Sequence, residues 1–277
     1  MSDELSADGR VLAVVIPAYN EEATIRTILD RVDSLDCVAE IIVVDDCSRD
    51  RTVEIVKAFE SPRLRLIRQD VNSGKTAAVQ CGLAEVTAPL TIIQDADLEY
   101  DPGEIPFVIA PILAGQADVV YGSRFIVRKA ARVLYFHHFL ANKTLTFLSN
   151  MLTNLNLTDI ETCYKAFRTP IIQKMPITSK GFGMEVEITA MLARIKARMY
   201  EVPISYYGRT YEEGKKIGYI DGVHALWYIF YYNLFSGLEP VRKQYFSELR
   251  RWLAGRRAEA EKGGSEAPWD LERTLTS

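Results

Sequence analysis

Apolar, strand-like runs alternate with helical patterns along the first half of the chain. The runs that favour strands cover residues 11–17 (VLAVVIP), 40–48 (EIIVVDDCS), 63–69, 90–97 (LTIIQDAD) and 117–125. The near-continuous apolar runs are typical of parallel strands that are covered on both faces. Between them, segments 20–35, 50–59 and 75–86 carry apolar residues at helical spacing. Alternating strands and helices predict an α/β fold with a mostly parallel central sheet flanked by helices.

Two polar residues mark the expected starts of the first two helices. Asn20 is expected to cap the helix that runs to about Leu35, with Glu21 and Glu22 in the first turn, where negative charge suits the helix dipole. Asp50 is expected to cap the next helix.

Acidic residues gather where the predicted strands end. Three ends carry the polar segments 17–21 (PAYNE), 45–46 (DD) and 95–101 (DADLEYD). In α/β sheets ligands bind beyond the carboxyl ends of the strands, so these segments predict one site. Asp95 and Asp97 have no helix to cap, because Pro102 and the turn after it delay the next helix. Carboxylates are rarely buried without a partner, so a positive group is expected beside them.

The composition is that of an ordinary globular protein, with 48% hydrophobic residues and a formal net charge of −4 over 277 residues. A general nucleic-acid binder would usually be basic, so no nucleic-acid partner is expected. The four cysteines (Cys37, Cys47, Cys81 and Cys163) form no C-x-x-C pair, which favours a reducing compartment over a disulfide framework. A polar N-terminus and the lack of an apolar run of about 18 residues predict a cytoplasmic location without a transmembrane helix.

Five motifs occur in a fixed order along the chain: VVIPAYNEEATI (14–25), VVDDCSRD (43–50), NSGKTAAVQCGL (72–83), IQDADLEYDP (93–102) and GSRF (122–125). In this order they resemble the inverting glycosyltransferases of GT-A family 2. Two later motifs, TDIETCYKAFR (158–168) and EVPISYYGRTYEEGKKIG (201–218), narrow the resemblance to the branch of dolichol-phosphate mannose synthase and bacterial polyprenyl-phosphate glycosyltransferases. The resemblance covers about residues 11–235 and implies a GT-A fold, with a Rossmann-like sheet.

For the donor side, the resemblance implies a metal site and a nucleotide pocket. Asp95 and Asp97 would hold Mg²⁺ or Mn²⁺ against the diphosphate of a nucleotide sugar, with Glu99 as a further ligand. The bound cation would be the positive partner of these acids. One of the two acids Asp45 and Asp46 would contact the base or ribose of the nucleotide. The other would only brace the turn in which it lies. The other residues expected to contact the donor are Pro17, Ala18, Tyr19, Glu21, Lys75 and Ala96.

For the acceptor side, the resemblance implies a phosphate-binding arginine and a basic loop. Arg124 would bind the acceptor's phosphate, which suits a planar guanidinium. His138 and Asn142, one turn apart on a helix expected over 131–152, match positions that help to hold this phosphate, although the family usually has other residues there. Arg209, Lys215 and Lys216 would close over the donor diphosphate. In proteins generally, a basic segment of this kind is more often a solvated charged loop than a phosphate-binding one.

The need for a general base depends on the acceptor. A phosphate monoester ionises near neutrality, with a second pKa of roughly 6, so a polyprenyl phosphate needs no strong base. Positioning and charge stabilisation by the metal, Arg124 and the Arg209 loop would then suffice. A hydroxyl acceptor would require a carboxylate, for which Asp159 and Glu185 are the candidates. Asp159 is expected to line the site, whereas Glu185 and Glu187 could equally be helix-start acids.

The sequence predicts a disordered start (1–10), a GT-A domain (11–240) and a tail (241–277) with a basic helix and an end that is expected to be disordered. Within the domain, 11–125 would bind the nucleotide sugar and 126–240 the acceptor. The aromatic segment 222–235 and the basic segment 242–257 allow two interpretations. They form a peripheral contact with a membrane or a membrane protein, or the aromatic helix packs on the sheet and the basic face is solvated.

The function expected from the resemblance is metal-dependent, inverting transfer of a hexose from a GDP-mannose or UDP-glucose type donor to a polyprenyl (dolichyl or undecaprenyl) phosphate. The alternative is the same chemistry on a saccharide or other hydroxyl in polysaccharide or glycoconjugate assembly. A non-catalytic nucleotide-sugar-binding subunit is disfavoured, because the Asp95-x-Asp97 pair and the basic loop are both intact. The sequence predicts no oligomeric state.

Overall fold

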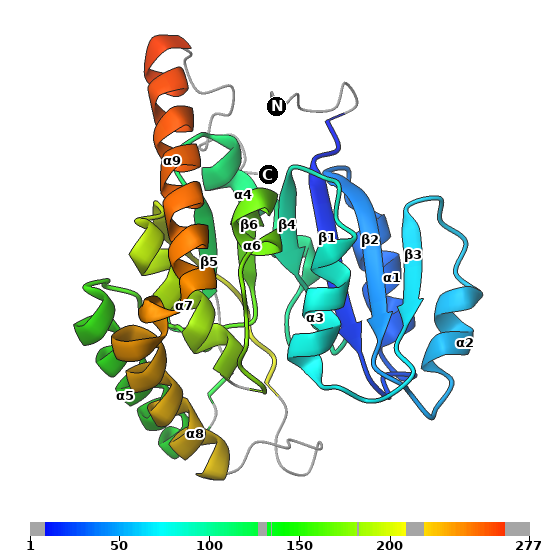
Figure 1. Cartoon of the computed structure of the whole chain (residues 1–277). Helices are drawn as coiled ribbons and strands as arrows, with labels where there is room; N and C mark the ends of the chain where they lie inside the picture. The colour runs from blue at the N-terminus through cyan, green and yellow to red at the C-terminus, as the bar shows by residue number, and fades with distance from the viewer. Residues whose placement is uncertain (1–8, 127–131, 134, 182, 209–218, 264–277) are drawn as a thin grey trace.

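The computed structural model describes residues 9–126, 132–133, 135–181, 183–208 and 219–263 (Figure 1). Within these residues seven strands form one sheet in the order β3-β2-β1-β4-β6-β5-β7. The strands are β1 (Leu12–Ala18), β2 (Val38–Asp45), β3 (Leu64–Arg68), β4 (Leu90–Ile93), β5 (Val119–Ser123), β6 (Lys165–Arg168) and β7 (Met199–Pro203). Neighbouring strands are parallel except at β6, so the predicted α/β fold with a mostly parallel sheet is confirmed.

Strand β6 was not predicted from the sequence. It pairs antiparallel with β4 on one side and β5 on the other, and so joins the two halves of the sheet. Its four residues are all buried, yet they begin with Lys165 and end with Arg168. Two charged ends on so short a strand hide the apolar run that usually marks a central strand.

Helices cover both faces of the sheet (Figure 1). The α-helices are α1 (Ile25–Asp33), α2 (Thr52–Lys57), α3 (Lys75–Ala84), α4 (Ile105–Leu113), α5 (Phe136–Thr153), α6 (Thr169–Gln173), α7 (Gly183–Ile195), α8 (Tyr219–Phe230) and α9 (Pro240–Gly263). Short 3₁₀ turns occupy Pro102–Glu104 (η1) and Ser236–Leu238 (η3), and a π-helical turn (η2, Tyr231–Phe235) continues α8. One buried core lies under α1, α2 and α4, and the other under α3 and α5 to α9.

Helix α1 begins later than the sequence pattern predicts. Asn20 does not cap it, because the residue before the first helical turn is Thr24. Asn20 instead has a backbone φ of 56°, in the left-handed region that asparagine tolerates better than most residues. The prediction of a cap at Asn20 was therefore wrong, and residues 19–24 form a longer loop at the end of β1. The N-cap residue of α2 is Arg51 and not Asp50, but Asp50, one residue earlier, accepts the N–H of Thr52, the first residue of α2 (3.0 Å).

The C-terminal helix α9 packs on α7 through a buried ion pair. Arg242 has no exposed surface, and its guanidinium donates to Glu187 of α7 (2.5 Å). Farther along, Arg257 donates to Asp118, which is also buried (3.3 Å). Two of the basic residues expected on a solvated or membrane-facing helix thus hold α9 to the domain. No helix among the described residues combines the length and apolar character that crossing a bilayer requires.

Candidate active site

The loops after β1 and β2 are fastened to each other at the carboxyl edge of the sheet. The Asn20 N–H donates to Ser48 Oγ (2.9 Å), and the Arg49 N–H donates to Asn20 Oδ1 (2.8 Å). The Glu21 N–H donates to Thr52 Oγ1 (2.8 Å). These bonds connect the two loops directly to each other and satisfy their backbone N–H groups within the protein.

The residues expected to line a nucleotide pocket lie along this edge. Pro17 is half-buried and Ala18 buried at the end of β1, and the side chain of Tyr19 is 36% exposed. The Glu21 carboxylate accepts the hydroxyl of Thr24 (2.9 Å). Tyr19 therefore offers the most open side chain of the four, and their contact with a nucleotide stays a prediction.

Asp45 and Asp46 both brace backbone. Asp45 is fully buried and accepts the Ser48 N–H (3.2 Å), which closes the turn after β2. Asp46 accepts the N–H groups of Ser73 (2.7 Å) and Gly74 (2.8 Å) just before α3. Gly74 has a φ of 86°, which a residue with a side chain rarely adopts. Asp46 thus braces the chain where α3 begins, and a contact of either acid with base or ribose stays a prediction.

The positive group beside Asp95 in this structure is Lys75, the first residue of α3. Its ammonium lies 2.6 Å from Asp95 Oδ1 and 2.9 Å from Cys163 Sγ. Burial alone would lower the pKa of Lys75, but Asp95, together with Cys163 and Glu185, holds that pKa well above its usual value. Burial would likewise raise the pKa of Asp95, and Lys75 lowers it. Both Lys75 and Asp95 are therefore charged. Ala96, the next residue after Asp95, is buried.

Asp97 and Glu99 lie on the turn after β4. Asp97 Oδ1 accepts the N–H of Glu99 (3.1 Å), and Glu99 Oε2 accepts the hydroxyl of Tyr206 (3.0 Å). Throughout the described parts of the chain, no three Asp, Glu, His or Cys side chains converge as metal ligands would. A pre-assembled site of three carboxylates is therefore absent there. The hard oxygens of Asp95 and Asp97 still fit Mg²⁺ or Mn²⁺, because such ions often bind one or two carboxylates and take their other ligands from substrate phosphates and water.

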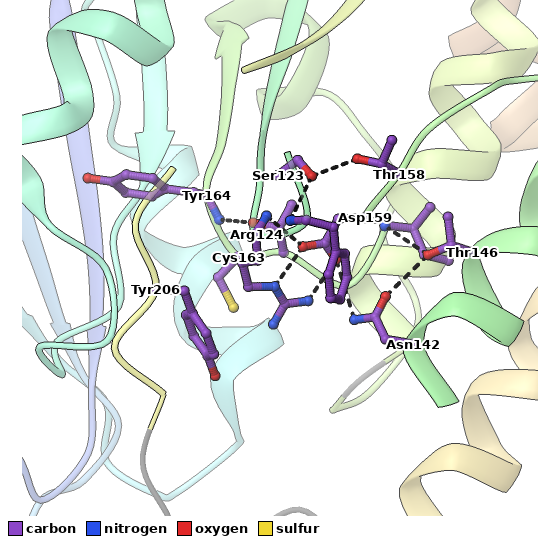
Figure 2. A network of polar contacts seen from close by, with 12 residues as sticks. Ser123, Arg124, Asn142, Thr146, Thr158, Asp159, Cys163, Tyr164 and Tyr206 are labelled. Atoms are coloured by element: carbon purple, nitrogen blue, oxygen red, sulfur yellow. Dashed lines mark hydrogen bonds and ion pairs between the residues drawn. The ribbon is translucent and has the colours of Figure 1, made fainter. Parts of the chain in front are cut away.

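Arg124 follows β5 directly and forms a two-pronged ion pair with Asp159 (Figure 2). Its Nε lies 2.6 Å from Asp159 Oδ2 and its Nη2 lies 2.7 Å from Oδ1, while its backbone N–H donates to Oδ2 (3.2 Å). Burial would raise the pKa of Asp159, which has no exposed surface, but the Arg124 guanidinium outweighs it and lowers that pKa. An aspartate with a lowered pKa and both oxygens engaged is a poor general base. Its evident role is to orient Arg124.

Helix α5 holds the loop that carries Asp159. Four polar side chains on one side of α5 bond to residues 157–160 of this loop. These bonds join Asn142 Nδ2 to Asp159 Oδ1 (3.4 Å), Lys143 Nζ to Thr158 O (3.1 Å), Ile160 N to Thr146 Oγ1 (3.4 Å) and Asn150 Nδ2 to Leu157 O (2.7 Å). Figure 2 shows Asn142 and Thr146 reaching this loop from α5. Asn142 therefore touches the carboxylate that orients Arg124.

The fold brings together a second pair of carboxyl groups, Glu161 and Glu185, of which only Glu185 was identified from the sequence. Both have a side-chain oxygen that is buried and has no hydrogen-bond partner among the described residues. Burial, and then the nearby charge of Glu185, raise the pKa of Glu161 to about 8. The Lys165 ammonium donates to the carbonyl oxygens of Ile160 (3.0 Å) and Thr162, and burial lowers its pKa. The sequence identified Glu185 as a candidate base but gave no signal for Glu161, because only the fold brings the two together.

Tyr206 is another residue that the sequence did not single out. The guanidinium carbon of Arg124 lies 5.1 Å from the centre of its ring, and its hydroxyl bonds to Glu99. Tyr206 therefore links the acidic turn after β4 to the arginine after β5. The repeated tyrosine in PISYYG (203–208) is the signal that could have found it. Arg209, Lys215 and Lys216, the predicted basic clamp, lie outside the described residues.

Acids and cations meet at the carboxyl edge of a mostly parallel sheet, which is where such folds bind their ligands. Residues 13–175 match glycosyl transferase family 2, and the chain belongs to this family. It is 29% identical over 225 residues to the undecaprenyl-phosphate mannosyltransferase of Micrococcus luteus, which covers 77% of this chain and 90% of that protein. It is 32% identical to the undecaprenyl-phosphate 4-deoxy-4-formamido-L-arabinose transferase of Aeromonas hydrophila, over 76% of this chain and 64% of that protein.

Solved structures confirm the fold. Glucosyl-3-phosphoglycerate synthase of Mycobacterium tuberculosis superposes with a TM-score of 0.63 at 23% identity, and the match covers 82% of each chain. The same enzyme in complex with Mn²⁺ and uridine-diphosphate-glucose gives a TM-score of 0.63 at 22% identity, over 81% of this chain and 79% of that one. The chain therefore has the GT-A fold of these glycosyltransferases.

Proposed function

We propose that this glycosyltransferase moves a hexose from a nucleotide sugar to the phosphate of a polyprenyl phosphate, with inversion at the anomeric carbon. The observation that carries the proposal is the ion pair of Arg124 and Asp159. It fixes a guanidinium for an anionic acceptor, and it occupies Asp159, one of the two carboxylates that could act as the base for a hydroxyl acceptor. The two relatives are named as transferases that act with undecaprenyl phosphate, which supports the same acceptor class here.

The reaction requires no proton transfer to start. An oxygen of the acceptor phosphate attacks the anomeric carbon, and the bond from that carbon to the donor's diphosphate breaks. The nucleoside diphosphate leaves with the electron pair. Because the second pKa of a phosphate monoester is about 6, the attacking oxygen is already ionised near neutral pH. Alignment and charge stabilisation are then the tasks left to the protein.

Arg124 is the residue we assign to the acceptor phosphate. Asp159 binds its Nε and Nη2, and the ring of Tyr206 lies beside the guanidinium. A guanidinium that is fixed in this way loses little side-chain freedom when a phosphate binds, which favours tight and directed binding. Asp159 and Tyr206 therefore act as positioning residues for Arg124.

We assign the donor diphosphate to the other edge of the site. Asp95 and Asp97 would hold Mg²⁺ or Mn²⁺, and the bound ion would neutralise the charge that develops on the leaving diphosphate. Lys75, now paired with Asp95, supplies a further positive charge at this point. The proposal gives Arg209, Lys215 and Lys216 the role of closing over the diphosphate. It assigns the nucleotide to the edge that carries Tyr19.

A hydroxyl acceptor is the second candidate, and one observation favours it. Glu185 is buried and has an oxygen without a hydrogen-bond partner among the described residues, so this carboxylate can accept a proton. A saccharide acceptor would need such a base. The substitution Glu185→Gln therefore distinguishes the two candidates. It should reduce transfer to a hydroxyl, which needs a base, but not transfer to a phosphate, which needs none.

A donor panel tests both candidates. GDP-mannose, UDP-glucose and UDP-N-acetylglucosamine would each be incubated with the protein and Mn²⁺, with and without a short-chain polyprenyl phosphate. Release of the nucleoside diphosphate that requires both the metal and the lipid phosphate supports the proposal. In that assay Glu185→Gln should retain most of the turnover. Donor binding without lipid-dependent release would favour the hydroxyl acceptor, and the absence of donor binding would refute both.

A further inference from the structure

Glu201 of β7 binds the loop that carries Asp159. Its carboxylate accepts the N–H of Thr158 through both oxygens (2.9 and 2.8 Å) and the N–H of Asp159 through Oε1 (3.2 Å). It also accepts the hydroxyl of Thr158 (3.1 Å). One side chain therefore satisfies two consecutive backbone amides, and the second belongs to the aspartate that orients Arg124. Glu201 opens the motif EVPISYYGRTYEEGKKIG, but no role was predicted for it from the sequence.

The sheet determines where this carboxylate lies. Glu201 pairs with Tyr121 in the parallel register of β5 and β7. Successive side chains of a strand point to opposite faces of the sheet, and paired residues of adjacent strands share a face. Tyr121 packs in the core under α3 and α5 to α9, so Glu201 points to this side as well. The backbone of the sheet, and not the loop that it binds, therefore sets the position of Glu201.

A chain of hydroxyl groups extends from Glu201 to the backbone beside Arg124. The Thr158 hydroxyl donates to Glu201, and its oxygen lies 2.6 Å from Ser123 Oγ (Figure 2). Because the Thr158 hydroxyl has a single proton and gives it to the carboxylate, Ser123 is the donor in this second bond. Ser123 Oγ in turn accepts the N–H of Phe125 (3.2 Å). Glu201 thus reaches Arg124 by two routes, through the loop of its ion-pair partner and through its own backbone neighbours.

Helix α5 holds the same loop at different atoms. Its side chains bond to the carbonyl oxygens of residues 157 and 158, to the N–H groups of residues 157 and 160, and to the Asp159 carboxylate. In the described part of the chain, the N–H groups of Thr158 and Asp159 are left to Glu201. Loss of the Glu201 carboxylate would therefore release two buried donors that α5 does not reach.

We propose that Glu201 is a positioning residue for Arg124, and that it sets the direction in which the guanidinium faces an acceptor phosphate. Asp159 binds Nε and Nη2 of Arg124 side by side, so the planar guanidinium turns with the carboxylate. The backbone that Glu201 holds fixes this carboxylate. A displacement of about 1 Å in a positioning group can reduce a rate about a hundredfold. The part of this inference that concerns the acceptor rests on the proposed function, whereas the fixing of the loop does not.

Amide hydrogen exchange, read residue by residue by NMR, tests the fixing of the loop without any substrate. Methionine is about as long as glutamate but cannot replace its bonds, so Glu201→Met should make the Thr158 and Asp159 amides exchange about tenfold faster. The matched control is Glu40→Met. Glu40 lies near the start of β2 and likewise accepts the N–H (3.1 Å) and the hydroxyl of Thr87. Its loss should leave exchange in the Asp159 loop unchanged.

Steady-state kinetics with a short-chain polyprenyl phosphate tests the link to the acceptor. Glu201→Met should raise KM for the lipid phosphate by about tenfold and leave KM for the nucleotide sugar unchanged. Partial unfolding alone would lower kcat and would not produce this split. Glu201→Gln keeps an oxygen at Oε1 that can accept both N–H groups, so its KM should lie between those of wild type and Glu201→Met. It also serves as the test variant if Glu201→Met does not fold.

Three results would overturn the inference. They are unchanged exchange of both amides in Glu201→Met, a wild-type KM for the lipid phosphate in that variant, and an equal rise of this KM in Glu40→Met. In each case wild-type turnover that depends on the lipid phosphate would leave the proposed function standing. Conversely, no such turnover in the wild-type protein would refute the proposed function and, with it, the role of Glu201 toward an acceptor. Faster exchange in Glu201→Met would even then assign Glu201 to the loop of Asp159.

Discussion

The acids of the donor half and those of the acceptor half are stabilised in different ways. In the donor half, Asp45 and Asp46 accept backbone N–H groups of neighbouring loops, and the loops are cross-bonded at Asn20. In the acceptor half, Asp159 is neutralised by Arg124. Glu161 and Glu185 keep buried oxygens that no described residue satisfies. Asp45 and Asp46 thus rely mainly on backbone amides, although Asp95 in the same half is paired with Lys75, whereas Asp159 relies on a buried cation.

This difference has a functional consequence. In the donor half, bonds from backbone amides to Asp45 and Asp46 connect neighbouring loops within the protein. Buried charges interact strongly, and each depends on its partner, so the acceptor edge responds to pH and to an incoming anion. We infer that selectivity for the acceptor resides in the charges around Arg124, and that the donor edge supplies a fixed platform.

Removal of Arg124 is expected to have the largest effect and tests whether the acceptor half depends on its buried ion pair. Arg124→Met leaves the buried Asp159 without its cation, which should cost about 3 kcal/mol in the free energy of unfolding. Turnover should fall by about a thousandfold, because the charge that holds the acceptor is lost. Urea unfolding and nucleotide release measure the two effects. The double variant Arg124→Met, Asp159→Asn should recover part of the stability and none of the activity. If it recovered none of the stability, the two side chains would not form the ion pair described.

The donor-edge counterpart is Asp97→Asn. It should reduce turnover by about a hundredfold through weaker binding of Mn²⁺ with the nucleotide. Its free energy of unfolding should change by less than about 1 kcal/mol, because Asp97 is only half-buried. Titration calorimetry with Mn²⁺ and a nucleoside diphosphate measures the metal. Glu99→Gln is the matched variant that tests whether Glu99 is a third metal ligand. A loss of metal affinity as large as that of Asp97→Asn would make Glu99 a ligand, whereas a small loss would limit it to binding Tyr206.

Much of this comparison could be predicted from the sequence, but not all of it. Apolar runs predicted the parallel strands, and acids at strand ends predicted the candidate site at their carboxyl edge, because each signal depends on neighbours in the chain. The partner of Asp95 illustrates the limit. The sequence demanded a positive group and, through the resemblance, assigned a metal, whereas the structure brings Lys75 there. The pairs Arg124–Asp159 and Glu161–Glu185 join residues far apart in the sequence, and no periodicity encodes such contacts. Strand β6 was missed because charged residues occupy both its ends.

Glu161 should make the stability of the protein depend on pH. Burial and Glu185 raise its pKa to about 8 in the folded chain, well above that of an exposed glutamate. Between these two pKa values the folded state holds a proton that the unfolded state has released, so stability falls as pH rises from about 4.5 to about 8. Glu161→Gln should remove this slope and stabilise the protein at pH 9 by an amount on the order of 2 kcal/mol. Urea unfolding at pH 6 and pH 9 measures it. Equal slopes in variant and wild type would show that Glu161 ionises like an exposed carboxylate.

Tyr206 gives the smallest and most discriminating test, because it touches both halves. Tyr206→Phe removes the hydroxyl that Glu99 accepts and keeps the ring beside Arg124. Tyr206→Leu removes both. Loss of the hydroxyl should cost about 1 kcal/mol and lower turnover only a few-fold. Loss of the ring should add a rise in KM for the acceptor, since Arg124 is then less constrained. Steady-state kinetics with each substrate varied in turn separates the effects. If Tyr206→Phe raised the acceptor KM as much as Tyr206→Leu, Tyr206 would act on Arg124 through Glu99, and the donor and acceptor edges would not be independent.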